Sequence, residues 1–188
     1  MRAYNGDPTM KSDLIRQMRE HREAEKLIQG SYWVGGQGCA VGCLTHDPSG
    51  GHALYESEWG IPKVLAYLED AIFEGLPAKQ AQAWPERFLA AIPPGVCLSF
   101  VWPRWVAATL RDLLALESVQ ADPGASAAIE SVAALYDRVI AVEPVSEQEW
   151  EAAESAARAA ARGAEAAESA ARGAGAAAAA RAAAARAA

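Results

Sequence analysis

Two cysteines and two histidines fall close together in this chain, in the spacing Cys39-x3-Cys43-x2-His46-x5-His52. Two thiolates and two imidazoles complete a tetrahedral ligand set, so zinc is the cofactor that this segment would bind. On a helix, Cys39, Cys43 and His46 would share one face. On a strand, the two cysteines would lie about 13 Å apart and could not share one ion. The spacing is neither that of a zinc knuckle nor that of a classical finger.

A cysteine nucleophile is the second chemistry that these residue types allow. Cys39 follows Gly-Gln-Gly, and at the start of a helix its pKa would be lowered by the helix dipole. The other roles would fall to a base (His46 or His52), an orienting acid (Glu56 or Glu58) and an oxyanion donor (Gln37). This set resembles a papain-like protease in residue types only. The histidine of those enzymes lies far downstream, whereas no histidine follows His52 here.

The same segment also fits a tightly packed β-hairpin without any chemistry, which is the interpretation we favour. Residues 32–34 and 39–45 alternate like strands around a glycine turn, and residues 52–58 could form a third strand. Small Cys, Ala, Val and Gly side chains let backbones approach closely. Cys97 lies in an apolar run and is expected in the core.

Helices are expected on both sides of this segment. Asp7-Pro8 is a helix start, and apolar residues recur at helical spacing over 61–72, 84–92, 103–114 and 129–140. Ser146 and Glu149 fit a capping box that opens an alanine-rich segment. The sequence therefore predicts a predominantly helical α+β fold. A multi-helix domain at 1–145 would carry a small β-hairpin or meander at about 31–58, and a long Ala-rich helix would occupy 146–188.

Composition excludes several classes of protein. The 188 residues carry a net charge of −7 with a pI near 5.0, which disfavours direct binding of nucleic acid. No apolar run is long enough to cross a membrane, and no signal peptide is visible. Three cysteines form no secreted disulfide pattern, so reduced thiols and a cytoplasmic location are expected.

Several runs of the chain resemble a group of small phage and bacterial proteins. These runs are GQGCAVGCLTH, YESEWGIPKVLAYLEDAIFEGLP, WPERFLAAIPPG and LSFVWPRW, and the resemblance covers about Ser12 to Tyr136. The group has no assigned activity, so the resemblance implies a mobile-element setting but supplies no catalytic residues.

Three functional hypotheses follow. The leading one is a non-enzymatic accessory or inhibitor of phage type, such as an anti-CRISPR, that binds a protein of the host and needs no cofactor. Its expected binding surface comprises Trp33, Gln37, Tyr55, Glu56, Glu58 and Trp59. The alternatives are a zinc- or cysteine-dependent hydrolase centred on Cys39, Cys43, His46 and His52, with Glu56 as a further catalytic candidate, and a homo-oligomer assembled through 146–188.

Overall fold

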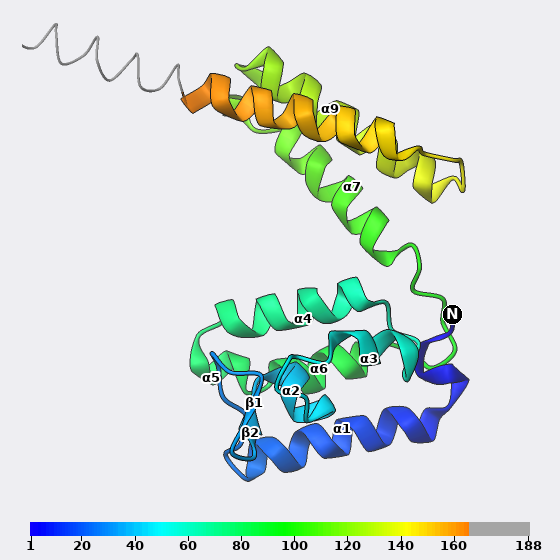
Figure 1. The fold of residues 1–188 in the computed structure, drawn as a ribbon, viewed down its shortest axis with the longest axis vertical. Coiled ribbons are helices and arrows are strands. Elements are labelled where there is room, and N and C mark those ends of the chain that lie inside the picture. The colour runs from blue at the N-terminus through cyan, green and yellow to red at the C-terminus, as the bar shows by residue number, and fades with distance from the viewer. Residues whose placement is uncertain (166–188) are drawn as a thin grey trace, which may run out of the picture. The chain divides into compact units, whose positions relative to one another are not determined.

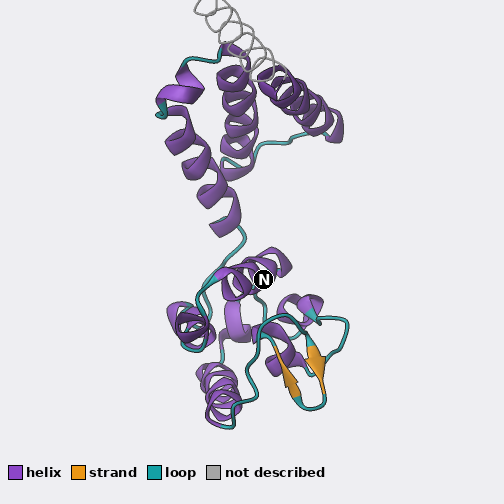
Figure 2. Cartoon of the chain, turned by 90° about the vertical axis from the view of Figure 1, so that its left-hand side faces the viewer, coloured by secondary structure: helices purple, strands orange, loops and turns teal. Residues whose placement is uncertain are grey.

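The computed structural model describes residues 1–165, and most of these residues are helical (Figure 1). The described part has one sheet, a two-stranded antiparallel ribbon near the N-terminus (Figure 2). The predicted predominantly helical α+β fold is therefore confirmed. The chain divides into two compact units, Met1–Trp102 and a second that begins at Pro103. The domain expected at 1–145 thus spans both units, and the part of the Ala-rich segment at 166–188 lies outside the described residues.

Helices of the first unit begin where the local sequence favours a start. The Asp7 carboxylate accepts the backbone N–H of Thr9 at 2.7 Å, and Pro8 opens α1 (Pro8–Glu23), as predicted. α6 (Trp84–Ala91) likewise has a proline in its first turn. The remaining elements outside the cysteine segment are η1 (Ala3–Gly6), α4 (Lys63–Gly75) and α5 (Ala78–Ala81).

The core of the first unit lies between α1, α4 and α6. α1 contacts α6, and α4 contacts α6 and the short helices of the cysteine segment. The large side chains at the centre, including Met18, Ile61, Phe73 and Leu89, are fully buried. Burial of each such side chain stabilises the fold by about 1.5–3 kcal/mol. Because α4 lies at the middle of these contacts, its polar side chains are held against neighbouring elements.

The cysteine segment is helical, so the strand predicted for residues 39–45 is wrong. β1 (Trp33–Val34) pairs with β2 (Gln37–Gly38) around a Gly-Gly turn, and α2 (Ala40–Thr45) follows at once. The hairpin with a glycine turn is thus present but ends seven residues earlier than its predicted second strand.

Close backbone approach explains the helix. A Cβ atom on Gly42 would lie only 1.5 Å from the carbonyl oxygen of Tyr32, and one on Gly38 only 1.9 Å from it. Glycine at both positions lets α2 lie directly on the backbone that precedes β1. This tertiary contact outweighs the strand propensity of Val41 and Thr45.

Residues 52–58 do not form the third strand that was predicted. They form α3 (His52–Ser57), which follows Gly51 in the left-handed region at φ 61°. α3 contacts α4. His52, its first residue, is therefore held beside the core helix rather than at a sheet edge.

The start of the chain is tied to the end of the first unit. Ala3 and the segment at 95–96 exchange backbone hydrogen bonds, since Ala3 N–H donates to Val96 O (2.9 Å) and Gly95 N–H donates to Ala3 O (2.8 Å). The buried Tyr4 hydroxyl donates to the carbonyl of Leu89 at 2.7 Å. Residues nearly one hundred positions apart thus close the unit.

The second unit consists of helices alone within its described residues. They are α7 (Val101–Leu114), whose first two residues still belong to the first unit, α8 (Glu117–Gln120), α9 (Pro123–Ile140) and a helix over 147–165. The capping box is confirmed: Ser146 N–H donates to the Glu149 carboxylate (2.7 Å), and Glu149 N–H donates to Ser146 Oγ (3.3 Å). Glu149 also pairs with Arg138 of α9. In the part of the chain that the structure describes, no helix combines the length and apolar character needed to span a bilayer.

Candidate functional site

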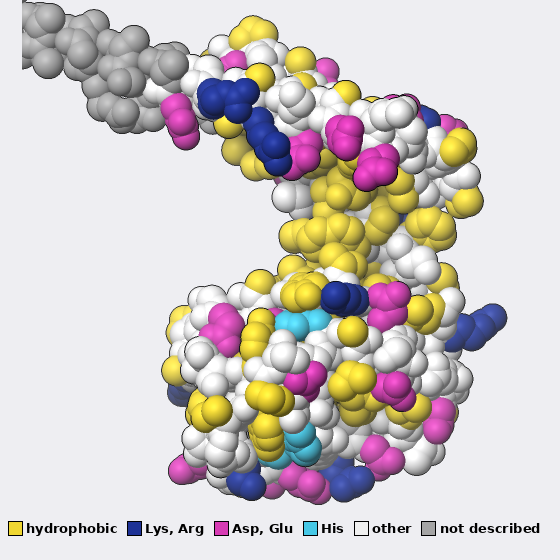
Figure 3. Space-filling view, in the orientation of Figure 1, with side chains coloured by type: hydrophobic (Ala, Val, Ile, Leu, Met, Phe, Trp, Pro, Cys, Tyr) yellow, Lys and Arg dark blue, Asp and Glu magenta, His cyan; other side chains and the backbone are white. Residues whose placement is uncertain are grey.

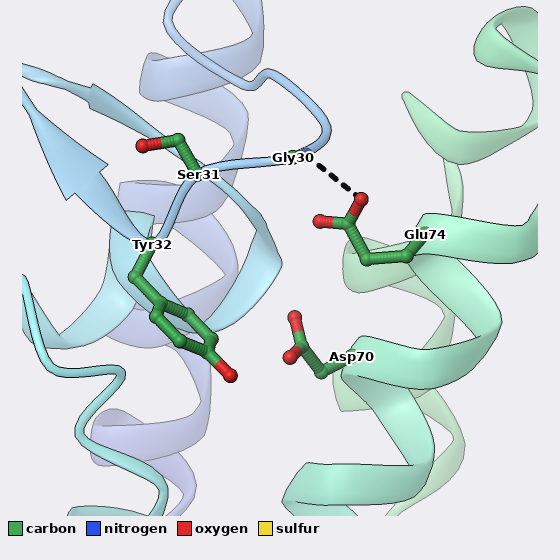
Figure 4. Close-up of a pocket in the computed structure, with 5 residues that line it drawn as sticks. All are labelled: Gly30, Ser31, Tyr32, Asp70 and Glu74. Carbon is green, nitrogen blue, oxygen red and sulfur yellow. Dashed lines mark hydrogen bonds between the residues drawn. The ribbon is translucent and has the colours of Figure 1, made fainter.

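A pocket of about 330 Å³ opens in the first unit between the segment before β1 and helix α4 (Figure 4). Gly30, Ser31 and Tyr32 line one side, and Asp70 and Glu74 line the other. The two carboxylates lie one helical turn apart on α4, so they point to the same side of that helix. In Figure 4, both face the Tyr32 side of the pocket, and Glu74 accepts the N–H of Gly30 at 2.8 Å.

Cys39 completes a cluster with these two carboxylates. It is the residue before α2, and its side chain is 1% exposed. One potential ligand atom from each of Cys39, Asp70 and Glu74 lies within 4.8 Å of the other two. Among residues 1–165, this is the one group of three or more His, Cys, Asp or Glu side chains that is so closely spaced.

His52 adjoins the cluster through Asp70. Its Nε2 lies 3.3 Å from Asp70 Oδ2, and the ring is 5% exposed. Tyr67 stacks on the imidazole with ring centroids 4.1 Å apart, and Tyr32 meets it edge-on at 5.4 Å. His52 is therefore fixed between two aromatic rings, with one nitrogen turned toward the carboxylate.

The cluster lacks a fixed positive charge. In the described part of the chain, no Lys or Arg side chain lies within ion-pair distance of Asp70 or Glu74. Asp70 Oδ1 is buried and has no hydrogen-bond partner. Burial raises the pKa of Glu74, and the neighbouring Asp70 raises it further against the opposing N–H of Gly30. Burial, with a smaller contribution from Asp70, raises the pKa of the Cys39 thiol to about 12.

A second buried acid lies behind the cluster. Glu69 is fully buried on α4, and its Oε2 accepts the hydroxyl of Tyr55 at 2.6 Å. Its other oxygen has no partner, and burial raises the pKa of this carboxyl to about 8. The buried Glu69–Tyr55 pair therefore lies in the core, next in sequence to the pocket residue Asp70.

The four ligands expected from the sequence do not come together. Cys39 belongs to the cluster and His52 adjoins it through Asp70, whereas Cys43 turns its thiol toward the carbonyl of Gly38 at 3.3 Å. Burial raises the pKa of Cys43 to about 12 as well. His46 ends α2 in the left-handed region and lies beside His21, with the two Nε2 atoms 3.0 Å apart.

The nucleophile hypothesis meets two obstacles in this geometry. Cys39 does precede a helix, as it requires, but a thiol with a pKa near 12 stays protonated at neutral pH. Glu56, one of the proposed acids, caps α4 by accepting the N–H of Lys63 at 2.8 Å. Neither His46 nor Glu56 therefore occupies the role expected of it.

The residues of the expected binding surface differ widely in solvent exposure. Gln37, Glu56 and Glu58 are exposed, and Trp33 and Trp59 are half-buried. Tyr55 is fully buried and cannot be presented to a partner. Cys97, expected in the core, is exposed.

Asp70 and Glu74 were missed at the sequence level, although a signal for them exists. In LEDAIFEG the two acids stand four residues apart, and Glu69 interrupts the apolar face of the helix. Like charges at this spacing slightly destabilise a helix, so the two acids were a feature of the sequence to which a ligand role could have been given.

Comparison with protein-family models, with curated proteins and with solved structures gives no match to this chain. Function is therefore inferred from the geometry of the site alone.

Proposed function

We propose that this protein binds a divalent transition-metal ion of the zinc class through Cys39, Asp70 and Glu74. The observation that carries the proposal is the convergence of a thiol and two carboxylates within 4.8 Å, without a Lys or Arg partner among the described residues. Three groups that can each carry negative charge, of which Cys39 is buried, Asp70 half-buried and Glu74 exposed, repel one another unless a proton or a cation intervenes.

The donor atoms suit such an ion. Zinc accepts thiolate sulfur and carboxylate oxygen, and a site with three protein ligands leaves a fourth position open. Coordination deprotonates a thiol outright, so binding would offset the high pKa of Cys39. Asp70 Oδ1, which is buried without a hydrogen-bond partner, would gain one in the ion.

His52 and the pocket would then have distinct roles. The hydrogen bond between His52 Nε2 and Asp70 Oδ2 would orient the carboxylate, as outer partners of metal ligands commonly do. Because Asp70 and Glu74 line the pocket, the open position would face its interior and admit water or a small ligand. Tyr32 stands at this opening with its hydroxyl available to a bound molecule.

Metal content tests the proposal directly. The purified full chain, loaded with zinc and then desalted, should retain about one equivalent of the ion. Cys39→Ser and Asp70→Asn should each abolish retention, and Cys97→Ser is the matched control because that thiol is exposed and distant in sequence. Equal zinc retention by Cys39→Ser and Cys97→Ser would overturn the assignment.

A role in binding another protein is the second candidate. It is supported by exposed apolar side chains on the first unit: Val34 is 65%, Tyr67 49% and Tyr32 38% exposed. Aromatic residues are enriched in the energetic centres of interfaces. A phage-type accessory or inhibitor, including an anti-CRISPR, belongs to this class. A host protein retained by the wild type but not by Tyr67→Ala would support it, whereas equal retention by both would count against this surface.

A further inference from the structure

A second group of ring nitrogens lies outside the site described above. His21 is in the last turn of α1, His46 follows α2, and Trp33 belongs to β1. The Nε2 atoms of the two histidines are 3.0 Å apart, although the residues are 25 positions apart in sequence. Histidine side chains are visible on the surface of the first unit (cyan in Figure 3), and His46 is exposed while His21 is half-buried.

Trp33 holds the pair in place. Its indole stacks on His46 with centroids 4.4 Å apart and an interplanar angle of 29°. It also contacts His21 edge-on at 5.4 Å. The two imidazoles are themselves nearly perpendicular, at 89°. Each ring is therefore restricted by the indole and by the other imidazole.

The backbones that carry the two histidines are also fixed to each other. The Gln17 side-chain amide, one turn before His21, donates to the carbonyls of Cys43 (2.9 Å) and Leu44 (3.1 Å). These are carbonyls of the last turn of α2, which the helix itself leaves without partners. The contact joins α1 to the end of α2 and thereby sets the separation of His21 and His46.

We infer that His21 and His46 form a second metal site, which binds one divalent ion through the two Nε2 atoms in a cis arrangement. Metal–nitrogen bonds of about 2.0–2.1 Å that span the observed 3.0 Å separation enclose an angle of about 94°. This angle suits the square-planar or tetragonal coordination of Ni²⁺ and Cu²⁺. Tetrahedral zinc would need the two nitrogens about 3.4 Å apart.

Binding requires a change of tautomer and a rotation of the rings, because one Nε2 in the hydrogen-bonded pair points at the other nitrogen rather than at a shared ion. In the neutral pair, one Nε2–H donates to the lone pair of the other ring. When both rings carry their proton on Nδ1, both Nε2 lone pairs are free for the ion, and no proton is released. Water would fill the remaining positions, since His46 is exposed. Burial lowers the pKa of His21, and the neighbouring His46 and Lys26 lower it further, whereas Glu20 opposes them, so the neutral imidazole that binds a metal ion is favoured.

The site is independent of the one formed by Cys39, Asp70 and Glu74, because it shares no residue with it. Ni²⁺ is the better probe of the two ions, since Cu²⁺ oxidises free thiols and the chain has three cysteines. Trp33, one of six tryptophans, supplies a reporter, because a transition-metal ion bound next to a stacked indole partly quenches the fluorescence of the chain.

The test is a titration of the full chain with Ni²⁺, in which binding is measured by calorimetry and by tryptophan fluorescence. His21→Gln and His46→Asn should each weaken Ni²⁺ binding by at least about tenfold and remove the quenching. Asparagine is chosen at 46 because it tolerates the left-handed backbone there (φ 54°). Cys39→Ser should leave Ni²⁺ binding unchanged, which separates this site from the proposed zinc site.

Two results would overturn the inference. One is Ni²⁺ affinity in both histidine variants equal to that of the wild type, with far-ultraviolet circular dichroism showing all three proteins folded. The other is zinc binding to the same histidines as tightly as Ni²⁺, which would contradict the coordination angle derived from the 3.0 Å separation.

Discussion

Replacement of Gly42 by alanine tests the close approach that makes the cysteine segment helical. The added Cβ would lie 1.5 Å from the carbonyl oxygen of Tyr32 and 2.4 Å from its carbonyl carbon, where ordinary contact begins near 3.4 Å. The two backbones would have to separate by roughly 2 Å. No rotamer change can relieve this contact, because the backbone fixes the position of the Cβ atom and the carbonyl of Tyr32 belongs to the main chain.

The expected cost is about 3 kcal/mol of unfolding free energy, at the upper end of the range for overpacked cores. The separation would also carry Cys39, whose N–H donates to Ser31 O at 2.7 Å, away from its neighbours on α4. We therefore expect Gly42→Ala to lose zinc retention along with stability.

Gly75→Ala is the matched control. Gly75 is the last residue of α4, its φ lies outside the left-handed region, and a Cβ there meets nothing within 4 Å. That change should stabilise the protein by about 0.5–1 kcal/mol through helix propensity and reduced entropy of the unfolded chain. Urea unfolding monitored by circular dichroism measures both variants. A Gly42→Ala protein within about 0.5 kcal/mol of the wild type would refute the close-packing explanation.

Three further outcomes are expected. A thiol reagent at pH 8 should modify Cys97 rapidly and Cys39 only after unfolding. The reason is that Cys97 is exposed and has a lowered pKa, whereas burial raises the pKa of Cys39 to about 12. Rapid modification of Cys39 in the folded protein would instead support the nucleophile hypothesis. Tyr55→Phe should lower the free energy of unfolding in urea by about 1–3 kcal/mol, since it leaves the buried Glu69 without its hydroxyl donor. An unchanged free energy of unfolding would mean that this hydrogen bond makes no net contribution to stability. The pKa of Glu149 is lowered to about 2, chiefly by its hydrogen bond with Arg138. The stability that Glu149 contributes is therefore present above its ordinary pKa near 4.5 and is lost as the pH falls toward 2. In an acid titration of helicity, the Glu149→Gln protein should lack this loss of stability, and parallel curves for the variant and the wild type would contradict the assignment.

Helix starts were predictable because their causes are local. Asp7 caps α1 through a residue two positions away, and Ser146 with Glu149 closes a box within four residues. Each of these contacts can be recognised in a short window of sequence. The helical periodicity of 61–72 is similarly local, and it corresponds to α4.

The cysteine segment and the site were not predictable in this way. The helix at 40–45 depends on Gly42 meeting the carbonyl of Tyr32, a contact that no short window reveals. The cluster needs Cys39 to meet Asp70 and Glu74, which are more than thirty residues away. The spacing of cysteines and histidines along the chain pointed instead to Cys43 and His46, which are close to Cys39 in sequence but do not join the cluster in the structure.

The exchange of hydrogen bonds between Ala3 and residues 95–96 has a consequence for biosynthesis. Translation runs from Ala3 toward Val96, so the native partners of Ala3 emerge from the ribosome only after roughly ninety more residues have been translated. Until then the Tyr4 hydroxyl lacks the Leu89 carbonyl that it meets in the finished protein. Ala3 and Tyr4 are thus among the last residues of this unit to reach their places, and closure of the unit must await the chain that follows them.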